Sequence, residues 1–355
     1  MRGDSRELHG RFVVPRESTK AVHLRRALWA RVASLRLSGS PVSIKDQVQK
    51  AVDCYNAGAT VLDVHVREED GKGSKRLSKF NELLAGLREA VPDMILQVGG
   101  SISFAPENEG DAAKWLSDDT RHMLAELLPK PDQVTIAINT NQMNVCEKMT
   151  AADVAGTSLG EPKMYEAYRE MTIPAGPSWM EEHLRRLQAK RIQTEFQLGD
   201  VAQLETVERM MRRGIYRGPL KLTYVMIGGG FDGANPYTLM NFIRHVPDGA
   251  ILTLESSMRH VLPINMMAIA MGLHVRCGIE DNIWTQDHAS KMSTVAQIEQ
   301  LVRISREFGR EIATGKEARK IYKVDEFYDG VDETLAKVGF APNRKPGQRG
   351  FTLHA

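Results

Sequence analysis

The sequence predicts an α/β fold, specifically a closed (β/α)8 (TIM) barrel, and three observations support this prediction. Short runs rich in apolar and β-branched residues alternate with segments of helical periodicity. The alternation occurs eight times between residues 27 and 312. No linker rich in Pro, Gly or Ser interrupts the array. An open, doubly wound sheet is the alternative, but eight units within this span favour a closed barrel.

The eight predicted strands are short apolar runs bounded by polar or turn-forming residues. In chain order they are ALWARVASL (27–35), TVLDVHVR (60–67), MILQVGGS (94–101), QVTIAIN (133–139), IQTEFQLG (192–199), LKLTYVMI (220–227), AILTLESS (250–257) and HVRCGIED (274–281).

The segments between these strands have helical periodicity and good helix formers. The first begins at Ser43, has Asp46 three residues later as a near capping box, and stops at Gly58. The second begins at Ser78 and ends before Pro92. The predicted helices span 43–58, 78–91, 118–130, 178–190, 201–214, 235–246, 259–272 and 294–309.

Three regions are predicted from this pattern: an N-terminal arm (1–26), a barrel catalytic domain (27–312) and a C-terminal extension (313–355). The arm is polar and the extension ends in the basic stretch APNRKPGQRGFTLHA. We expect both to contact other subunits of a homo-oligomer, a dimer or a tetramer. The long connection 140–176 suits a lid or an interface.

Composition excludes several classes of function. The chain has 47 basic and 45 acidic residues and a net charge of +2, which gives no indication of a nucleic-acid or membrane partner. Its three cysteines lack CxxC spacing, so neither a disulfide framework nor a cysteine-based zinc finger is expected. No apolar run is long enough to span a membrane, and the N-terminus lacks a signal-peptide pattern. The sequence therefore predicts a soluble, cytoplasmic protein.

The predicted strand 60–67 carries an unusual row of polar residues. Side chains alternate along a strand, so Asp63, His65 and Arg67 share one face. An antiparallel strand with one wet face would explain the row without a function. In a parallel barrel, however, such a row ends at the mouth where these enzymes place their active sites.

Polar and glycine residues also follow the other predicted strands. A metal site is possible, because an Asp, a His and a Glu meeting at one mouth suit a divalent cation. Taken singly, a D-x-H pair is more often hydrogen-bonded than metal-binding, and a glycine run is more often a turn. His274 is expected to be a core histidine. The candidates are Asp63, His65, Arg67, Gly99, Gly100, Ser101, Asn139, Asn141, Asn144, Glu195, Gly228, Gly229, Gly230, Glu255, Arg276, Glu280 and Asp281.

Several of these motifs, in this order, resemble the β-keto acid cleavage enzyme family, which includes the 3-keto-5-aminohexanoate cleavage enzymes. The motifs are NAGATVLDVHVREEDGKGS, MILQVGG, TIAINTNQMN and AMGLHVRCGIEDNIW, and the resemblance covers about residues 27–310. It implies a (β/α)8 barrel that binds one divalent metal, zinc above all. It also implies condensation of a β-keto acid with acetyl-CoA, giving acetoacetate and a new acyl-CoA.

The resemblance implies a role for each matching residue. His65 and Glu280 would be metal ligands, with Asp63 in place of the first histidine of the family's H-x-H pair. Arg276 and Asp281 would form a catalytic dyad, with Asp281 as base. Glu195, on the predicted strand 192–199, is a second candidate base.

Substrate and CoA sites are expected at the strand ends. The implied substrate-binding residues are Gly99, Gly100, Ser101, Asn139 and Asn144, and the CoA moiety is expected near Gly228, Gly229 and Gly230. Gln97 and Val98 stand where the family has hydroxyl residues, and Asn141 and Gln142 where it has Gly and Ser. Two alternatives remain open: another metal-dependent barrel lyase or aldolase acting through an enolate, and a non-catalytic relative with an eroded metal site.

Overall fold

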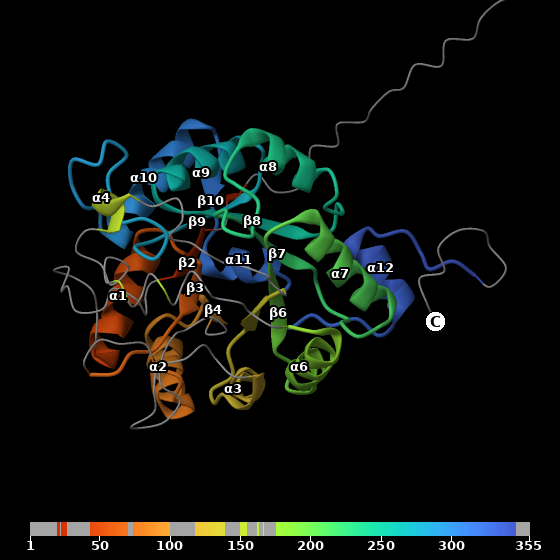
Figure 1. Ribbon diagram of the computed structural model, residues 1–355. Coiled ribbons are helices and arrows are strands. Elements are labelled where there is room, and N and C mark those ends of the chain that lie inside the picture. The colour runs from red at the N-terminus through yellow and green to blue at the C-terminus, as the bar shows by residue number, and fades with distance from the viewer. Residues whose placement is uncertain are drawn as a thin grey trace, which may run out of the picture.

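The computed structural model describes residues 20–21, 23–26, 43–69, 74–99, 118–138, 150–154 and 175–345, together with 162 and 166. Within these residues, eight parallel strands close into a barrel, each paired with the next and the last with the first (Figure 1). Helices surround the strands on the outside. The predicted fold class is confirmed.

The barrel strands are β2 (His23–Arg26), β3 (Val61–Val64), β4 (Ile95–Val98), β5 (Gln133–Ala137), β6 (Gln193–Leu198), β7 (Lys221–Met226), β8 (Ile251–Ser256) and β9 (His274–Cys277). All but β2 lie within the predicted runs.

The prediction of the first strand was wrong. The strand that pairs with β3 and β9 is β2, whereas the apolar run 27–35 lies outside the described residues. The barrel therefore begins before residue 27, and part of the predicted arm belongs to it. A strand between two partners is held by backbone hydrogen bonds on both edges, so the short HLRR segment does not need the apolar pattern on which the prediction relied.

The outer helices are α1 (Ile44–Asn56), α2 (Leu77–Ala90), α3 (Asp118–Met123) with the 3-10 turn Leu124–Glu126, α4 (Ala151–Val154), α6 (Pro177–Ala189), α7 (Val201–Arg212), α8 (Pro236–Ile243), the 3-10 turn Met258–His260 with α9 (Val261–Ala270), and α10 (Thr294–Glu307). In the described part of the chain, no helix combines the length and apolarity needed to cross a bilayer.

Helix ends follow the sequence signals in most places. The Ser43 hydroxyl caps α1 by accepting a hydrogen bond from the Asp46 amide at 3.1 Å. Gly58, just past the helix, has a φ of +113°, which an L side chain rarely adopts. The start of α2 differs from the prediction, because its N-cap is Arg76 rather than Ser78.

The interior of the barrel is lined largely by polar side chains, and the candidate site is built from them. Outward residues such as Leu62, Leu96 and Phe196 pack with the helices in the main hydrophobic core. Most of the alternate residues on the strands point the other way and are buried polar groups, whereas Val61, Ile95 and Ile251 form a small apolar cluster with Tyr322. The polar groups include Asp63, Gln97, Gln133, Thr135, Gln193, Glu195, Lys221, Thr223, Thr253, Glu255 and Arg276. TIM-barrel interiors are ordinarily dominated by branched apolar residues, so this chain must satisfy its interior by hydrogen bonds.

The described part of the C-terminal extension packs on its own barrel. Just before the extension, strand β10 (Glu311–Ile312) pairs with β1 (Lys20–Ala21), and the extension itself contains α11 (Gly315–Ile321) and α12 (Val331–Val338). Tyr322, directly after α11, is buried, with its hydroxyl 3.1 Å from Thr253 Oγ1. Arg319 donates two hydrogen bonds to Asp132, which precedes β5, at 2.8 and 3.1 Å. The extension thus closes the N-terminal end of the barrel, opposite the predicted mouth.

Candidate active site

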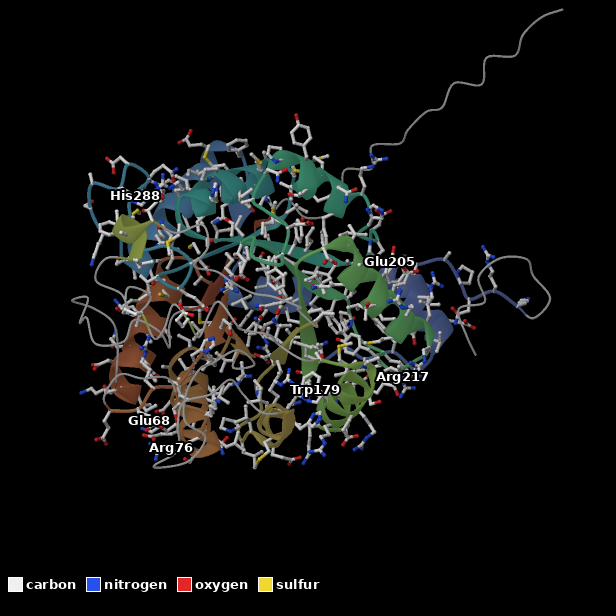
Figure 2. All side chains as sticks on the ribbon, viewed as in Figure 1. Glu68, Arg76, Trp179, Glu205, Arg217 and His288 are labelled. Atoms are coloured by element: carbon white, nitrogen blue, oxygen red, sulfur yellow. The ribbon has the colours of Figure 1, made fainter. Side chains whose placement is uncertain are left out.

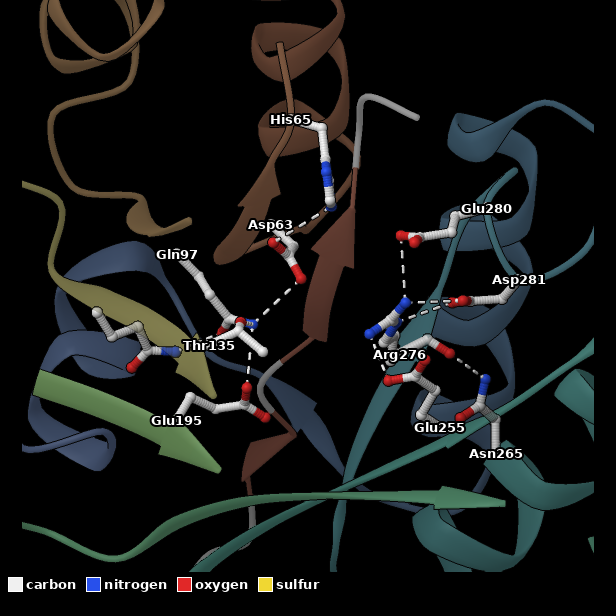
Figure 3. Close-up of polar contacts among 11 residues, drawn as sticks. Asp63, His65, Gln97, Thr135, Glu195, Glu255, Asn265, Arg276, Glu280 and Asp281 are labelled. Atoms are coloured by element: carbon white, nitrogen blue, oxygen red, sulfur yellow. Dashed lines mark hydrogen bonds and ion pairs between the residues drawn. The ribbon is translucent and has the colours of Figure 1, made fainter. Parts of the chain in front are cut away.

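The first part of the site lies at the C-terminal end of β3. Asp63 is the third residue of β3 and His65 follows the strand, with His65 Nε2 4.0 Å from Asp63 Oδ1 (Figure 3). Both side chains are buried. Gly99, after β4, lies directly against them: an added Cβ would be 2.5 Å from Asp63 Oδ1 and 3.1 Å from His65 Nε2. Asp63 and His65, the predicted ligands, therefore lie next to Gly99, a predicted substrate-binding residue.

Replacing Gly99 by Ala should damage the site more than the fold. The new methyl group would overlap a carboxylate oxygen, so Asp63 must turn away. A misplacement of about 1 Å at a reacting group costs about 100-fold in rate, and we expect a fall in kcat/KM of that order. Gly176→Ala is the control, because nothing lies within 4 Å of its Cβ position. Equal kinetics for the two variants would contradict this reading.

Gln97 on β4 joins the Asp63 side of the site to Glu195 on β6. Its Nε2 lies 3.2 Å from Asp63 Oδ2, 2.7 Å from Thr135 Oγ1 and 3.3 Å from Glu195 Oε2 (Figure 3). One amide group therefore donates toward two buried carboxylates. The sequence showed that Gln97 replaces a family hydroxyl residue, but not that it contacts both acids.

The second part of the site is centred on Arg276, the third residue of β9. Its guanidinium donates to both oxygens of Asp281, at 3.0 and 2.8 Å, and to Glu280 Oε2 at 3.2 Å. It also donates to Glu255 on β8, while its backbone carbonyl accepts from Asn265 at 2.7 Å. Three carboxylates surround one fully buried guanidinium, and their attraction outweighs the cost of burial and raises the Arg276 pKa above its ordinary value.

The predicted Arg276–Asp281 dyad is thus present as a bidentate pair. The chain reaches this arrangement by leaving strand geometry after Cys277: the amides of Asp281 and Asn282 both donate to the Gly278 carbonyl at 3.0 Å. Two successive residues, Glu280 and Asp281, can then reach the same guanidinium, which side chains alternating along a strand could not.

A second arginine lies on the Glu280 side of the site. Burial lowers the pKa of Arg67 to about 10, and attraction to Glu280 offsets only part of that shift. The next residue, Glu68, turns outward and forms ion pairs with Arg76 and Lys79 at the start of α2; Figure 2 shows Glu68 and Arg76 together at the edge of the molecule. Arg67 is therefore the last buried residue of the polar row that begins at Asp63 in β3.

The predicted metal ligands are brought together only in part. Asp63 and His65 lie side by side, but Glu280 is turned to Arg276, and within the described ranges no three His, Cys, Asp or Glu side chains form a cluster that could hold a metal. The chemistry of the donor pair, a carboxylate oxygen and an imidazole nitrogen, fits a divalent cation. Their separation of 4.0 Å exceeds the about 3.3 Å between two ligands of a tetrahedral zinc, so one side chain must rotate slightly for both to reach one ion. The space that Gly99 leaves open beside both atoms supports that fit.

The charge of the site also suits a cation. Among the side chains that the structure describes, five acidic ones face the barrel interior or its mouth and three cationic ones accompany them, which gives these eight groups a formal charge of −2. The acids are Asp63, Glu195, Glu255, Glu280 and Asp281, and the cations are Arg67, Lys221 and Arg276. Buried excess negative charge is costly unless a cation or protons compensate it.

The glycine run after β7 has a backbone that requires glycine. Gly228, Gly229 and Gly230 have φ values of +73°, +62° and +103°, and the Gly228 amide donates to the Asp232 carbonyl at 3.1 Å. The predicted residues Gly100, Ser101, Asn139 and Asn144 lie outside the described residues. His274 is buried at the start of β9 beside Tyr322, as expected of a core histidine, and burial lowers its pKa to about 3.

Two contacts of the site were missed by the sequence reasoning. Glu255 was noted at a strand end without a role, and Gln97 was noted only as a departure from the family. A signal existed in the spacing: polar residues recur at every second position in β6 (Gln193, Glu195, Gln197) and β8 (Thr253, Glu255). In a barrel whose outer face is covered by helices, that period indicates a polar interior.

Comparison with known proteins agrees with this geometry. The sequence model described as beta-keto acid cleavage enzyme matches residues 37–324, most of the chain. The chain belongs to this family. Membership makes the protein an enzyme of the β-keto acid cleavage type, and the resemblance noted in the sequence is confirmed.

Similar proteins carry names that differ in substrate. The 3-keto-5-aminohexanoate cleavage enzyme of Acetoanaerobium sticklandii is 26% identical over 283 residues, which cover 79% of this chain and 90% of that protein. The 3-oxoadipate:acetyl-CoA acetyltransferase of Cupriavidus necator is 23% identical over 79% of this chain and 87% of that protein. The 3-dehydrocarnitine:acetyl-CoA trimethylamine transferase of Rhizobium meliloti is 24% identical over 80% and 90%.

A solved structure shares the fold. ObcA in a binary complex with oxaloacetate has a TM-score of 0.59 and 11% sequence identity, covering 81% of this chain and 67% of that one. At this identity the likeness bears on the barrel architecture alone.

Proposed function

We propose that the protein cleaves a β-keto acid in an acetyl-CoA-dependent reaction that yields acetoacetate and a new acyl-CoA. The observation that carries the proposal is the buried Arg276 cluster facing the Asp63–His65 pair at the mouth of a β-keto acid cleavage barrel. The substrate's side chain is left open, because relatives at 20–26% identity act on different acids.

The reaction begins with removal of a proton from the carbon between the two carbonyl groups. Asp281, held by both oxygens on Arg276, is the proposed base, and Glu195 is a second candidate. The enolate attacks the thioester carbon of acetyl-CoA and displaces the CoA thiolate. The thiolate then attacks the former keto carbon, and the bond between that carbon and the acylated carbon breaks. Acetoacetate leaves after taking a proton, and the rest of the substrate leaves as acyl-CoA.

A divalent metal, most simply zinc, is proposed to bind at Asp63 and His65, with Glu280 as the third ligand. When bound it would supply a Lewis acid for the keto oxygen. Glu280 can bind the metal only if its hydrogen bond with Arg276 breaks. Arg276 would then still donate hydrogen bonds to Asp281 and Glu255. An Asp–His–Glu set has one more carboxylate than the family's usual ligands, so manganese or iron are suitable alternatives to zinc.

Replacing Asp63 by Ala should remove most of the bound metal. Loss of one of three ligands, and of the charge it brings, should weaken affinity by more than about 100-fold, since even residues behind the ligands cost 10–100-fold. Asp63→His should retain metal and shift preference toward zinc. Asp132→Asn is the control, a buried acid paired with arginines at the opposite end of the barrel. Metal content measured by mass spectrometry that is unchanged in Asp63→Ala would show that Asp63 is not a ligand.

Both substrates are proposed to bind at the C-terminal end of the barrel, beside the proposed metal site. We propose that Gly99, Gly100, Ser101, Asn139 and Asn144 hold the β-keto acid, with backbone amides on its carboxylate. The CoA moiety would lie near Gly228, Gly229 and Gly230. A homo-oligomer, dimer or tetramer, remains an expectation that light scattering can test.

The experiment that tests the function is a panel of β-keto acids incubated with metal-loaded protein and acetyl-CoA. The panel should vary in chain length and in the charge of the terminal group. We expect acetoacetate and an acyl-CoA in equal amounts for at least one acid, and neither product without acetyl-CoA. Cleavage that does not need acetyl-CoA would indicate a lyase or aldolase. No turnover by metal-loaded protein, together with retained ligand binding, would indicate a non-catalytic relative.

A further inference from the structure

Lys221, the first residue of β7, is buried at the bottom of the barrel interior. Its ammonium group donates to Gln133 Oε1 at 2.9 Å and to Gln193 Oε1 at 2.7 Å. Burial lowers the pKa of Lys221 to about 7, against the attraction of Asp132, Glu195 and Asp325. The ammonium group has three N–H bonds and the neutral amine has two. Lys221 can therefore donate to the side-chain oxygens of Gln133 and Gln193 whether it is protonated or neutral.

A lysine at this position fixes which way the two amides face. Protonated lysine has no acceptor, so each glutamine must turn its oxygen to Nζ and its amino group away. The Gln193 amino group then donates to the backbone carbonyls of Lys323 and Glu326, both at 2.8 Å. The Gln133 amino group donates to Gln97 Oε1 at 2.6 Å.

The orientation of Gln133 in turn fixes that of Gln97. With its oxygen occupied by Gln133, Gln97 must direct its amino group toward Asp63 and Glu195, whose nearest oxygens lie at 3.2 and 3.3 Å. A reversed Gln97 would bring an amide oxygen against two carboxylates, a repulsive arrangement in a buried site. Lys221, Gln133 and Gln97 therefore form a directional hydrogen-bond chain from the closed end of the barrel to its mouth.

We propose that this Lys221 hydrogen-bond chain positions Asp63 and Glu195 for their roles at the mouth, with Lys221 and Gln133 acting as positioning residues through Gln97. The roles of Asp63 and Glu195 rest on the proposed function, whereas the direction of the chain does not. If these buried polar groups only filled space, the orientation of the two glutamine amides would not affect Asp63 or Glu195.

Gln133→Glu reverses the direction of the Lys221 hydrogen-bond chain and leaves the size of the side chain almost unchanged. The introduced carboxylate would pair with Lys221 and has only acceptor oxygens, so Gln97 must turn its amino group toward it. Gln97 then presents its oxygen to Asp63 and Glu195. Gln193→Glu is the matched control, because it makes the same pairing with Lys221 on the other branch and leaves Gln97 untouched. The control should lose stability only, through the two backbone hydrogen bonds of Gln193.

The direct readout is the side-chain amide signals of Gln97 in metal-free protein labelled with 15N-glutamine, assigned by their absence in Gln97→Leu. We expect these signals to move in Gln133→Glu and to stay in place in Gln193→Glu. The affinity of stripped protein for Zn²⁺ or Mn²⁺, measured by calorimetry, should fall about 10–100-fold in Gln133→Glu alone. Unmoved Gln97 signals in Gln133→Glu, or equal changes in both variants, would overturn the proposal.

A measurement on the unaltered protein keeps the proposal testable if Gln133→Glu does not fold. The nuclear Overhauser effects of the Gln97 amide protons should be stronger to the Thr135 side chain than to the side-chain amide protons of Gln133, since Nε2 lies 2.7 Å from Thr135 Oγ1 whereas Oε1 faces Gln133 Nε2 at 2.6 Å. The reverse order of intensities would show that Gln97 faces the other way and would refute the chain. Neither NMR test needs turnover, so a failure of the β-keto acid assay and a failure of this proposal are separate results.

Discussion

Arg276→Met is expected to abolish activity and to destabilise the protein by about 3–5 kcal/mol, the cost of leaving buried charges without their partner. Three carboxylates, those of Glu255, Glu280 and Asp281, depend on this one guanidinium. Methionine preserves much of the side-chain volume, so the loss reports charge and hydrogen bonding rather than a cavity. Urea unfolding at pH 7 and steady-state turnover are the two measurements.

The loss of stability in Arg276→Met should also depend on pH. Carboxyl groups left unpaired in a buried site bind protons more readily when folded than when unfolded. The folded state of the variant then holds more protons than the unfolded state, so its stability falls as pH rises and recovers as pH is lowered from 7 toward 5. A stability difference from the unaltered protein that stays constant over this range would contradict the charge argument.

Arg310→Met is the control for a buried arginine outside the site. Arg310 donates to the backbone carbonyls of Ile269, Leu273 and Gly272, at 3.1, 2.9 and 3.2 Å, at the end of α9. Its loss should destabilise the protein while each folded molecule retains its turnover. A similar loss of turnover in Arg310→Met would mean that Arg276→Met fails only through instability.

The fold was predictable because its pattern is repeated along the chain. Seven of the eight barrel strands are apolar runs followed by helical segments, and the order of the strands around the barrel is their order along the chain. The exception, His23–Arg26, has no apolar pattern and is held by pairing with β3 and β9, so only its three-dimensional context identifies it. The closing of the barrel bottom by Tyr322 and Arg319 was also missed, because contacts so distant in sequence have no local signal.

The site was predictable where a motif fixes local geometry. The family resemblance implied the pair Arg276 and Asp281, which meet through the turn at Gly278. Side-chain alternation along the predicted strand 60–67 placed Asp63 beside His65. The contacts between different strands were not predictable from spacing. Gln97 meets Glu195 across 98 residues of sequence, and the direction of its amide depends on Lys221, which is farther still.

Asp281→Asn and Glu280→Gln are expected to separate catalysis from metal binding. Asp281 gives both oxygens to Arg276, whereas Glu280 contributes one oxygen at 3.2 Å and also lies near Arg67. Glu280 therefore interacts more weakly with Arg276 than Asp281 does. Of the two acids, it can more readily leave Arg276 and bind a metal ion. Asp281 is the better held and so the better oriented base.

Asp281→Asn should leave metal content unchanged and lower kcat by about 10³–10⁴-fold, in the upper range for loss of a general base. Its amide cannot accept a proton, and its amino group would face the guanidinium of Arg276. Glu280→Gln should release the metal, because an amide oxygen brings no negative charge to the ion, and should recover part of its activity at high metal concentration. Metal content and kcat, measured for both variants, test whether Glu280 binds the metal and Asp281 acts as the base. Equal metal loss in the two, or full activity in Asp281→Asn, would reject this division of roles and leave Glu195 as the base.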